Sequence, residues 1–467
     1  MKKNIGVVWL REDFRISKND ALIYASQNHT SVVAVYVFKK KEFLKKKEAQ
    51  LWWLYKSLLN FREKLKKFNI NLEICEKDSF IDFFNEIIKK KNFSLYWNKI
   101  YEPDFLNFDQ KISKTLTSNK ISFKIFKGNI LNENEEVKKS DNTPFKVFTP
   151  FWKTAEKIFL EKGFSKEKKL EKKNNLNKFL SKNFVLESIL PSLKWPDKFN
   201  KYWNPSEEEA LLSIKNFIKN KIENYGTFRD IPGVYGTSRI SPFLAHGQIH
   251  VQTIWEQCEK IEKKGTGYRK FINELGWREF SHSLINYFPK MLKGNLKKEF
   301  DAFPWVERKD HLIAWKKGVT GYPIVDAGMR ELHETGWMHN RVRMITASFL
   351  VKHLRIHWKE GEKYFRNCLL DFNEANNVAG WQWVSGSGAD AAPYFRIFNP
   401  ILQGERFDKK GEYVKKWIPE LLHVPEKHIH KPWEMEEKIK DYPGPIVDHQ
   451  EARKKALEAF KKIKKTS

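Results

Sequence analysis

Apolar residues follow two different rhythms along the first 135 residues of the chain. Short apolar runs, which are typical of buried β-strands, occur at residues 5–10, 32–38, 72–75, 93–97 and 123–126. Between them, leucine and phenylalanine recur at helical spacing, most clearly over residues 49–68. Strands that alternate with helices predict a doubly wound, mostly parallel α/β domain over residues 1–133. No GxGxxG loop follows the first run, so the usual dinucleotide-binding fingerprint is missing.

The regular spacing of apolar residues becomes weaker after residue 133, and further along the chain it becomes helical. Residues 134–205 include a charged stretch with few apolar positions, 161–178, and we predict a linker between two domains. Within it, the motif FTPFWK at 148–153 is expected to be anchored. From residue 206 to 467 the period is helical almost throughout, which predicts an all-α domain.

The charge changes this picture only modestly. The chain has 86 Lys+Arg against 58 Asp+Glu, a net charge of +28, which favours attraction to polyanions such as nucleic acids. Most of the excess is lysine, 70 Lys against 16 Arg, which is also typical of a solvated surface. Residues 301–400 differ, with 7 Arg and 6 Lys. Arginine presents a planar fork to phosphate or carboxylate, so we expect a site in this window.

The cysteines and the apolar runs bear on disulfides, metal sites and membrane spans. Cys75, Cys258 and Cys368 include no close pair, which excludes a disulfide framework and a four-cysteine metal site. We therefore expect a reducing cytoplasm and no bound metal. No apolar run reaches the roughly 18 residues of a membrane span, so we expect no membrane partner. We also expect a monomer.

Two motifs combine polar groups in patterns that are unusual for a core. In GTSRIS, two hydroxyls and Arg239 stand before a predicted helix start; this suits a phosphate, and equally a simple helix cap. In NELGWREF, the residues Glu274, Trp277 and Arg278 fall on one helical face. They suit a polar-walled pocket that stacks a base, or else a half-exposed tryptophan beside an intrahelical ion pair.

A third motif covers residues 320–358 and predicts two helices, the second from about Asn340 to Trp358. On that helix Asn340, Arg343 and Met344 share a face that suits a ligand wall, while Arg341 points elsewhere.

The fourth motif, residues 369–400, gathers three short polar side chains and two tryptophans. Asp371, Asn373 and Asn377 converge within about two turns of a helix. Trp381 and Trp383 would then point to nearly opposite sides, because each helical residue turns by about 100°. One tryptophan could face one ligand and the other a second.

Together these motifs resemble the DNA photolyase and cryptochrome family, most of all its class I cyclobutane pyrimidine dimer photolyases. The segments that carry the resemblance are WLREDFRISKNDAL, GTSRISP, NELGWREF, TGYPIVDAGMREL, NRVRMITASFLVKHL and WQWVSGSGADAAPYFRIFNP. They span essentially the whole chain. The resemblance implies a Rossmann-like N-terminal domain with an antenna chromophore, a folate or a deazaflavin, and a helical domain that holds FAD.

The resemblance also implies site residues by motif position. FAD would be bound by Tyr225, Thr237, Ser238, Arg239, Ser241, Arg278, Asn340, Arg343, Asp371, Asn373 and Asn377. A flipped-out dimer and its phosphates would be bound by Arg229, Glu274, Trp277, Asn340, Arg341, Met344, Trp383 and Arg396. Electrons would reach the flavin along Trp305, Trp358 and Trp381. Arg343 and Asp371 are expected to pair, and Asn377 to face flavin N5.

The implied activity is that of a carbon–carbon lyase that acts on damaged DNA. Photoexcited reduced FAD gives an electron to a pyrimidine dimer, the cyclobutane ring splits, and the electron returns. The alternatives are a cryptochrome-like blue-light receptor and a (6-4) photolyase, whose two pocket histidines are replaced here by Asn340 and Met344. Asn373 stands where many relatives have aspartate, and Phe105 where some have an acidic folate contact, which leaves the antenna unidentified.

Overall fold

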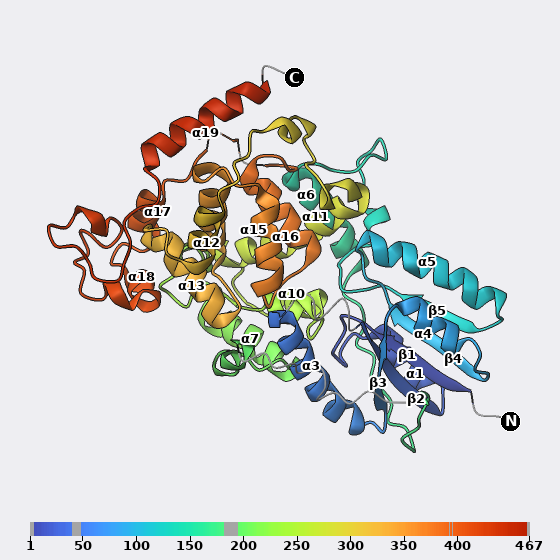
Figure 1. Ribbon diagram of the computed structural model, residues 1–467. Helices are drawn as coiled ribbons and strands as arrows, with labels where there is room; N and C mark the ends of the chain where they lie inside the picture. Colours follow the sequence, from blue (N-terminus) through green and yellow to red (C-terminus); the bar gives the residue numbers. More distant parts are fainter. Residues whose placement is uncertain (1–3, 40–47, 182–194, 392, 395, 465–467) are drawn as a thin grey trace.

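The computed structural model describes residues 4–39, 48–181, 195–391, 393–394 and 396–464. A parallel sheet lies at the N-terminal end of the molecule and helices make up the rest (Figure 1). None of the described helices is long and apolar enough to cross a membrane.

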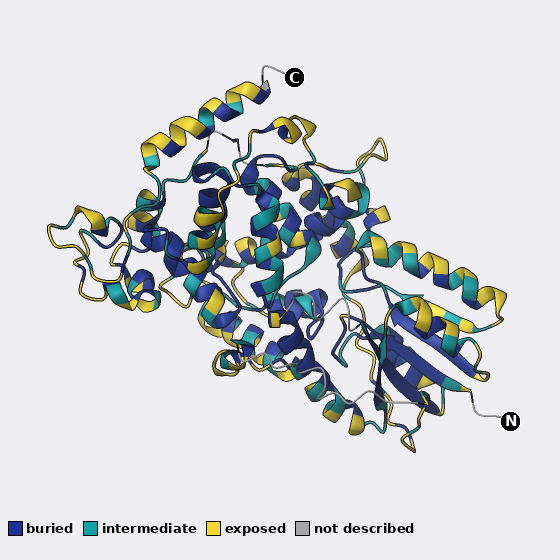
Figure 2. Cartoon of the chain, viewed as in Figure 1, coloured by how far each residue is buried: buried dark blue, intermediate teal, exposed yellow. Residues whose placement is uncertain are grey.

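The sheet has five parallel strands in the order β3-β2-β1-β4-β5. The strands are β1 (Ile5–Leu10), β2 (Ser31–Lys39), β3 (Asn71–Lys77), β4 (Phe93–Asn98) and β5 (Ser122–Phe126). All five lie at the predicted apolar runs. β1, β2 and β4 are buried along nearly their whole length, as in a parallel sheet covered on both faces (Figure 2).

Helices cover the two faces of the sheet. On one face lie α1 (Asp20–Asn28) and α3 (Glu48–Lys66), whose leucines pack with Val8, Val32 and Ala34. On the other lie α4 (Phe80–Ile87) and α5 (Pro103–Ser118), which pack with Val7, Val33 and Val35. The expected doubly wound domain is therefore confirmed.

Helix α3 also belongs to the core of the helical domain. Trp52 lies 5.5 Å from Phe199, and Trp53 lies 5.1 Å from Phe243, measured between ring centroids. The C-terminal half is built from α7 (Glu207–Asn220), α8 (Tyr225–Phe228), α9 (Ser241–Ala245), α10 (Val251–Glu259), α11 (Thr266–Tyr287), α12 (Lys309–Lys317), α13 (Pro323–Thr335), α14 (Asn340–Ser348), α15 (Trp358–Cys368), α16 (Glu374–Ser385), α17 (Pro400–Phe407), α18 (Glu412–Trp417) and α19 (His449–Lys464).

The single helix predicted from Asn340 to Trp358 is wrong. α14 ends at Ser348, a π-helical turn follows at Phe349–His353, and Arg355 has a positive φ of 53°. A new helix, α15, starts at Trp358 because the His357 ring nitrogen accepts from the backbone N–H of Lys359, 3.1 Å away, and caps it. The apolar period runs straight through this break, so the pattern could not reveal it.

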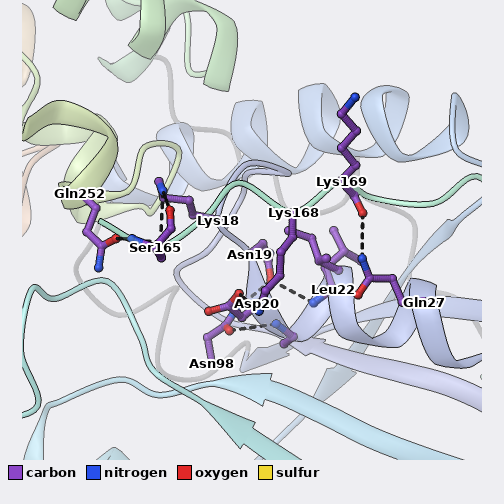
Figure 3. Close-up of polar contacts among 12 residues, drawn as sticks. Lys18, Asn19, Asp20, Leu22, Gln27, Asn98, Ser165, Lys168, Lys169 and Gln252 are labelled. Carbon is purple, nitrogen blue, oxygen red and sulfur yellow. Dashed lines mark hydrogen bonds and ion pairs between the residues drawn. The ribbon is translucent and has the colours of Figure 1, made fainter. Parts of the chain in front are cut away.

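The segment predicted as a linker contains helix α6 (Phe148–Lys162), which lies beside α11 (Figure 1). After α6 the chain is tied to both domains (Figure 3). Ser165 accepts from Lys18 of the α/β domain at 3.1 Å and donates to Gln252 of α10 at 2.8 Å. The carbonyl of Lys169 accepts from Gln27 at 3.4 Å. This part of the chain is thus held in place, while the domain boundaries stay predictions.

Candidate functional site

A buried carboxylate, Asp371, joins three elements of the helical domain. Its Oδ2 atom accepts from Arg343 Nη2 on α14 and from Ser241 Oγ at the start of α9, both at 2.7 Å. The Asp371 side chain is only 3% exposed. Arg343 Nε also donates to the Met338 carbonyl, at 2.7 Å. The structure thus brings together three predicted cofactor residues and contains the expected Arg343–Asp371 pair.

Arg239 lies between two aromatic rings near this pair. It has a positive φ of 52°, and its guanidinium carbon is 4.5 Å from the Trp203 ring and 4.7 Å from the Trp337 ring. Trp337 also donates to Ser241 Oγ at 3.2 Å, so Arg239 and the Asp371 cluster share a neighbour. Arg239 Nε and Asp371 Oδ1 are both buried without a hydrogen-bond partner in the described part of the chain.

Three further predicted cofactor residues, Tyr225, Thr237 and Ser238, precede Ser241 in the sequence. Tyr225 begins α8 and is buried against Phe217 and Phe271; burial raises the pKa of its hydroxyl. Thr237 and Ser238 are half-buried, and Ser238 Oγ accepts from the backbone N–H of Ile240 at 3.4 Å. The expected helix start is present, since α9 begins at Ser241.

The amide of Asn377 has one defined orientation. Its Nδ2 atom lies 2.9 Å from Glu362 Oε1 and 3.3 Å from the Glu362 carbonyl oxygen. Both partners are acceptors, so the atom that meets them must be the NH₂ group, and Oδ1 points elsewhere. Glu362 is fixed in turn by Arg366 at 2.8 Å; burial raises the pKa of Glu362, and Arg366 opposes that rise.

Asn373 has a structural role that its motif position did not suggest. It is the N-cap of α16, and its Oδ1 atom accepts from the backbone N–H of Asn376 at 3.1 Å. This contact satisfies one of the free N–H groups at the helix start. A direct contact of Asn373 with a cofactor stays a prediction.

The three tryptophans of the predicted electron chain differ in burial. Trp381 and Trp358 are buried, and Trp305 is half-buried. The His357 ring lies between the outer two, 4.8 Å from the Trp305 centroid and 5.6 Å from the Trp358 centroid. Trp358 is fixed by a hydrogen bond of 2.9 Å from its indole N–H to Asn295. Trp305 is thus the most exposed of the three, and their role as an electron chain stays a prediction.

Helix α11 separates residues that were predicted to act together. Trp277 is half-buried and stacks on Phe148 of α6, with ring centroids 3.7 Å apart. Glu274 pairs with Arg229, whereas Arg278 pairs with Glu279 at 2.9 Å. The alternative of an ion pair between Glu274 and Arg278 is therefore not what forms. Glu279 is buried and Arg278 is half-buried; desolvation lowers the pKa of Arg278 and raises that of Glu279.

Two of the predicted phosphate contacts, Arg229 and Arg341, form a half-exposed rim around Asp230. Arg341 pairs with Asp230 at 2.9 Å and packs over the Phe407 ring. Arg229 precedes Asp230 and also pairs with Glu274. Asn340 and Arg396 are exposed, and Met344 and Trp383 are half-buried. Arg229 directly follows α8, Arg341 lies on α14, and Arg396 lies outside the helices, before α17. The base-stacking candidates Trp277 and Trp383 come from α11 and α16, which pack against each other.

Comparisons with known proteins identify the family of the chain. The model of the FAD binding domain of DNA photolyase matches residues 271–462, and the DNA photolyase model matches residues 6–171. The deoxyribodipyrimidine photo-lyase of Agrobacterium fabrum is 38% identical, over 99% of this chain and 98% of its own. The chain belongs to the DNA photolyase family.

Solved photolyases show the same fold. A bacterial class III photolyase from Agrobacterium tumefaciens superimposes with a TM-score of 0.93 and 38% identity, covering 100% of this chain and 98% of the other. An archaeal photolyase from Sulfolobus tokodaii, which contains two FAD molecules, gives a TM-score of 0.84 at 28% identity, with 98% and 100% covered. The fold class is confirmed, and the class within the photolyase family stays a prediction.

FAD, the expected cofactor of the helical domain, is confirmed by the family of that domain. The residues present fit it. The unpaired Arg239 Nε is a buried charged donor, and the unpaired Asp371 Oδ1 is a buried acceptor. Buried polar groups are normally paired, so two such atoms beside one cluster call for a ligand with both acceptors and donors, as a flavin dinucleotide has.

Sequence reasoning missed several residues of this photolyase site. Glu362 fixes Asn377, Trp337 joins Arg239 to Ser241, and Asp230 pairs with Arg341. Glu362 had one usable signal, because Arg366 follows at the i+4 position of a helical ion pair. Phe148 had another, since its motif FTPFWK was expected to be anchored.

Proposed function

We propose that this photolyase repairs cyclobutane pyrimidine dimers in DNA under blue or near-ultraviolet light. When bound and reduced, FAD supplies the electron that light moves into the dimer; two carbon–carbon bonds break, and the electron returns. The net reaction consumes no reductant. The chain's own residues bind the cofactor, hold the lesion against it and exclude water.

The observation that carries the proposal is the fixed amide of Asn377. Because both contacts with Glu362 are made by the NH₂ group, the oxygen of Asn377 does not face Glu362, and we assign it to the cofactor. A carbonyl oxygen can accept a hydrogen bond from the N5–H that only a reduced flavin carries. Glu362 and Arg366 therefore favour the form of FAD that can donate an electron.

Lesion binding is assigned to several half-buried side chains and to the exposed Asn340. Trp277 and Trp383 offer rings for stacking, Met344 offers a polarizable side chain, and Glu274 and Asn340 offer polar groups for base edges. Flipping a dimer out of the duplex costs a few kcal/mol, less for a damaged pair that is already poorly stacked. That difference favours damaged over intact DNA.

The rim arginines are suited to phosphate binding because their present partners are weak. Arg341 pairs with Asp230, whose side chain is 32% exposed, and such surface pairs contribute only about 0–1 kcal/mol. A phosphate can replace the carboxylate at small cost. Arg229 and Arg396 are assigned the same role, and the lysine-rich surface adds attraction that depends on salt.

Trp305, Trp358 and Trp381 are assigned to the return of oxidised cofactor to its reduced form. We also infer a second, antenna chromophore, in line with the two FAD molecules of the Sulfolobus tokodaii relative. Its identity is open. The cytoplasmic location and the monomeric state remain predictions as well.

A substrate panel tests the proposal. Oligonucleotides that carry a single cyclobutane thymine dimer, a (6-4) photoproduct or no lesion are mixed with the chemically reduced enzyme and illuminated. We expect intact thymines to form from the first substrate alone. Conversion of the (6-4) substrate would favour a (6-4) photolyase. Conversion of neither, with reduced flavin verified by absorbance, would favour a light receptor without repair activity.

A further inference from the structure

One face of Trp277 is already covered in the protein. The Phe148 ring lies parallel to it, with an interplanar angle of 8° and centroids 3.7 Å apart. Phe148 is only 8% exposed, while Trp277 remains half-buried. Phe280 lies edge-on to both rings, about 6 Å from each, at 6.1 Å and 6.0 Å. Trp277 can therefore stack on a base through its other face only.

Helix α6, which carries Phe148, is held in register on α11. The Trp152 ring lies over Gly276, where an added Cβ atom would come within 2.4 Å of the ring. The indole N–H of Trp152 donates to Asn273 Oδ1 at 3.1 Å. Close approach through glycine and one directed hydrogen bond together fix the position of α6 along α11, and so the position of Phe148 against Trp277.

The start of α6 is held from a third element. Its N-cap residue, Val147, makes no side-chain cap, and the backbone N–H of Phe148 donates instead to Asp390 Oδ2 at 3.1 Å. Asp390 lies in the loop after α16, five residues beyond Ser385 where that helix ends, and has a φ of 46°. A carboxylate is favourable at a helix N-terminus, because the helix dipole is positive there.

We propose that Phe148 is a positioning residue for lesion recognition, which holds the Trp277 ring in the orientation that receives the flipped-out base. The role follows from preorganisation: a ring fixed in advance loses less conformational freedom when a base stacks on it. Phe148 itself is covered by Trp277 and does not reach the DNA. The inference rests on the proposed function, since it assigns Trp277 to the lesion pocket.

Two matched substitutions in α6 test it. Phe148→Leu removes the ring beside Trp277 and keeps an apolar side chain. Phe159→Leu makes the same change at the other end of α6, where the ring packs on Trp255 at 4.8 Å. Phe159 is the more deeply buried of the two, so a general loss of helix stability would appear at least as strongly in Phe159→Leu.

The measurement is the affinity of the FAD-loaded enzyme for oligothymidylate with one cyclobutane dimer, and for the same oligonucleotide without it. For Phe148→Leu we expect about tenfold weaker binding of the dimer-containing strand, the equivalent of about 1.4 kcal/mol, and unchanged binding of the intact strand. Repair at saturating substrate should stay at the wild-type rate, so that KM rises and kcat does not. Phe159→Leu should bind both strands like the wild type.

Phe148→Leu in a Trp277→Ala background distinguishes an effect through Trp277 from an effect by another route. If Phe148 acts through Trp277, Phe148→Leu causes no further loss once that ring is gone. Equal affinities of Phe148→Leu and Phe159→Leu, or an undiminished loss in the Trp277→Ala background, would overturn the inference. A wild-type enzyme that does not distinguish the two strands would instead contradict the proposed function.

Discussion

Arg341 and Arg343 stand two residues apart on α14, and both side chains are half-buried. Their partners differ. Arg343 binds Asp371, whose side chain is 3% exposed, and also donates to the Met338 carbonyl. Arg341 meets Asp230, whose side chain is 32% exposed, and packs over the Phe407 ring. The first carboxylate is buried and has a further hydrogen bond from Ser241, and the second is open to water.

The difference shows how one helix can serve a cofactor and a polyanion. A buried ion pair is costly to break, because removal of one partner leaves the other charge without water or a counterion. A half-exposed pair is weak and can exchange its partner. Arg343 is therefore suited to a permanent architectural role beside FAD, and Arg341 to reversible contact with phosphate.

The largest effect is expected from Arg343→Gln, which leaves Asp371 buried without its cation. Loss of one partner of a buried pair costs about 3–5 kcal/mol, so we expect a clearly lower Tm and purified protein that is depleted of FAD. Thermal unfolding and the ratio of flavin to protein absorbance measure both. Arg341→Gln is the control. Equal FAD loss in the two variants would contradict the assignment of Arg343 to FAD and of Arg341 to phosphate.

The next largest effect is expected at Lys352, a buried amine that has no carboxylate partner among the described residues. Lys352 is 2% exposed and donates to the Arg396 carbonyl at 2.8 Å. Burial, helped by the charge of Arg396, lowers the pKa of Lys352 to about 7 from 10.5. Between these two values the unfolded chain binds the proton more readily, so the free energy of unfolding should rise with pH above about 7, by at most about 1.4 kcal/mol per unit.

Urea unfolding at pH 7, 8 and 9 measures this slope. The free energy of unfolding of the wild type should rise relative to that of Lys352→Met as pH rises. A difference that stays constant over this range would show that Lys352 keeps its proton in the folded protein.

A smaller effect is expected from Arg341→Gln on DNA binding. Each lost phosphate contact lowers the slope of log K against log salt by about 1 and weakens binding of damaged and intact DNA alike. Titrations at several salt concentrations measure this. An unchanged slope would mean that Arg341 keeps Asp230 as its partner in the complex.

Trp305→Phe should leave repair unchanged. The half-buried Trp305 is the outermost of the three tryptophans, so the variant should slow only the photoreduction of oxidised enzyme. Absorbance of the flavin under light follows that step. Loss of repair by the chemically reduced variant would contradict the role given to Trp305.

Local patterns in the sequence predicted the strands well. The runs around Val7 and Val33 are buried on both faces, and continuous apolar residues are enough to mark such strands. The break near Arg355 was not predictable from the apolar period, since the positive φ there depends on tertiary contacts that the period does not encode.

The contacts of the site also include some that the sequence predicted and others that it did not. Motif positions predicted the Arg343–Asp371 pair that the structure contains. They did not predict the contact of Glu362 with Asn377 or that of Phe148 with Trp277. Phe148 meets Trp277 more than one hundred residues later, and no local spacing encodes such a contact. The separation of Arg278 from Glu274 has a similar cause, because Glu279 is held by the backbone N–H of Leu131 at 2.7 Å.

The central claim is the light-dependent reversal of pyrimidine dimers, and chemical counting of dimers tests it most directly. Ultraviolet-irradiated oligothymidylate is incubated with reduced, FAD-loaded enzyme in the dark and under blue light, and the remaining thymine dimers are separated and quantified. We predict that dimers disappear under light, with an equal gain of intact thymines, and persist in the dark. Dimers that persist under light, in the presence of verified reduced flavin, would contradict the account.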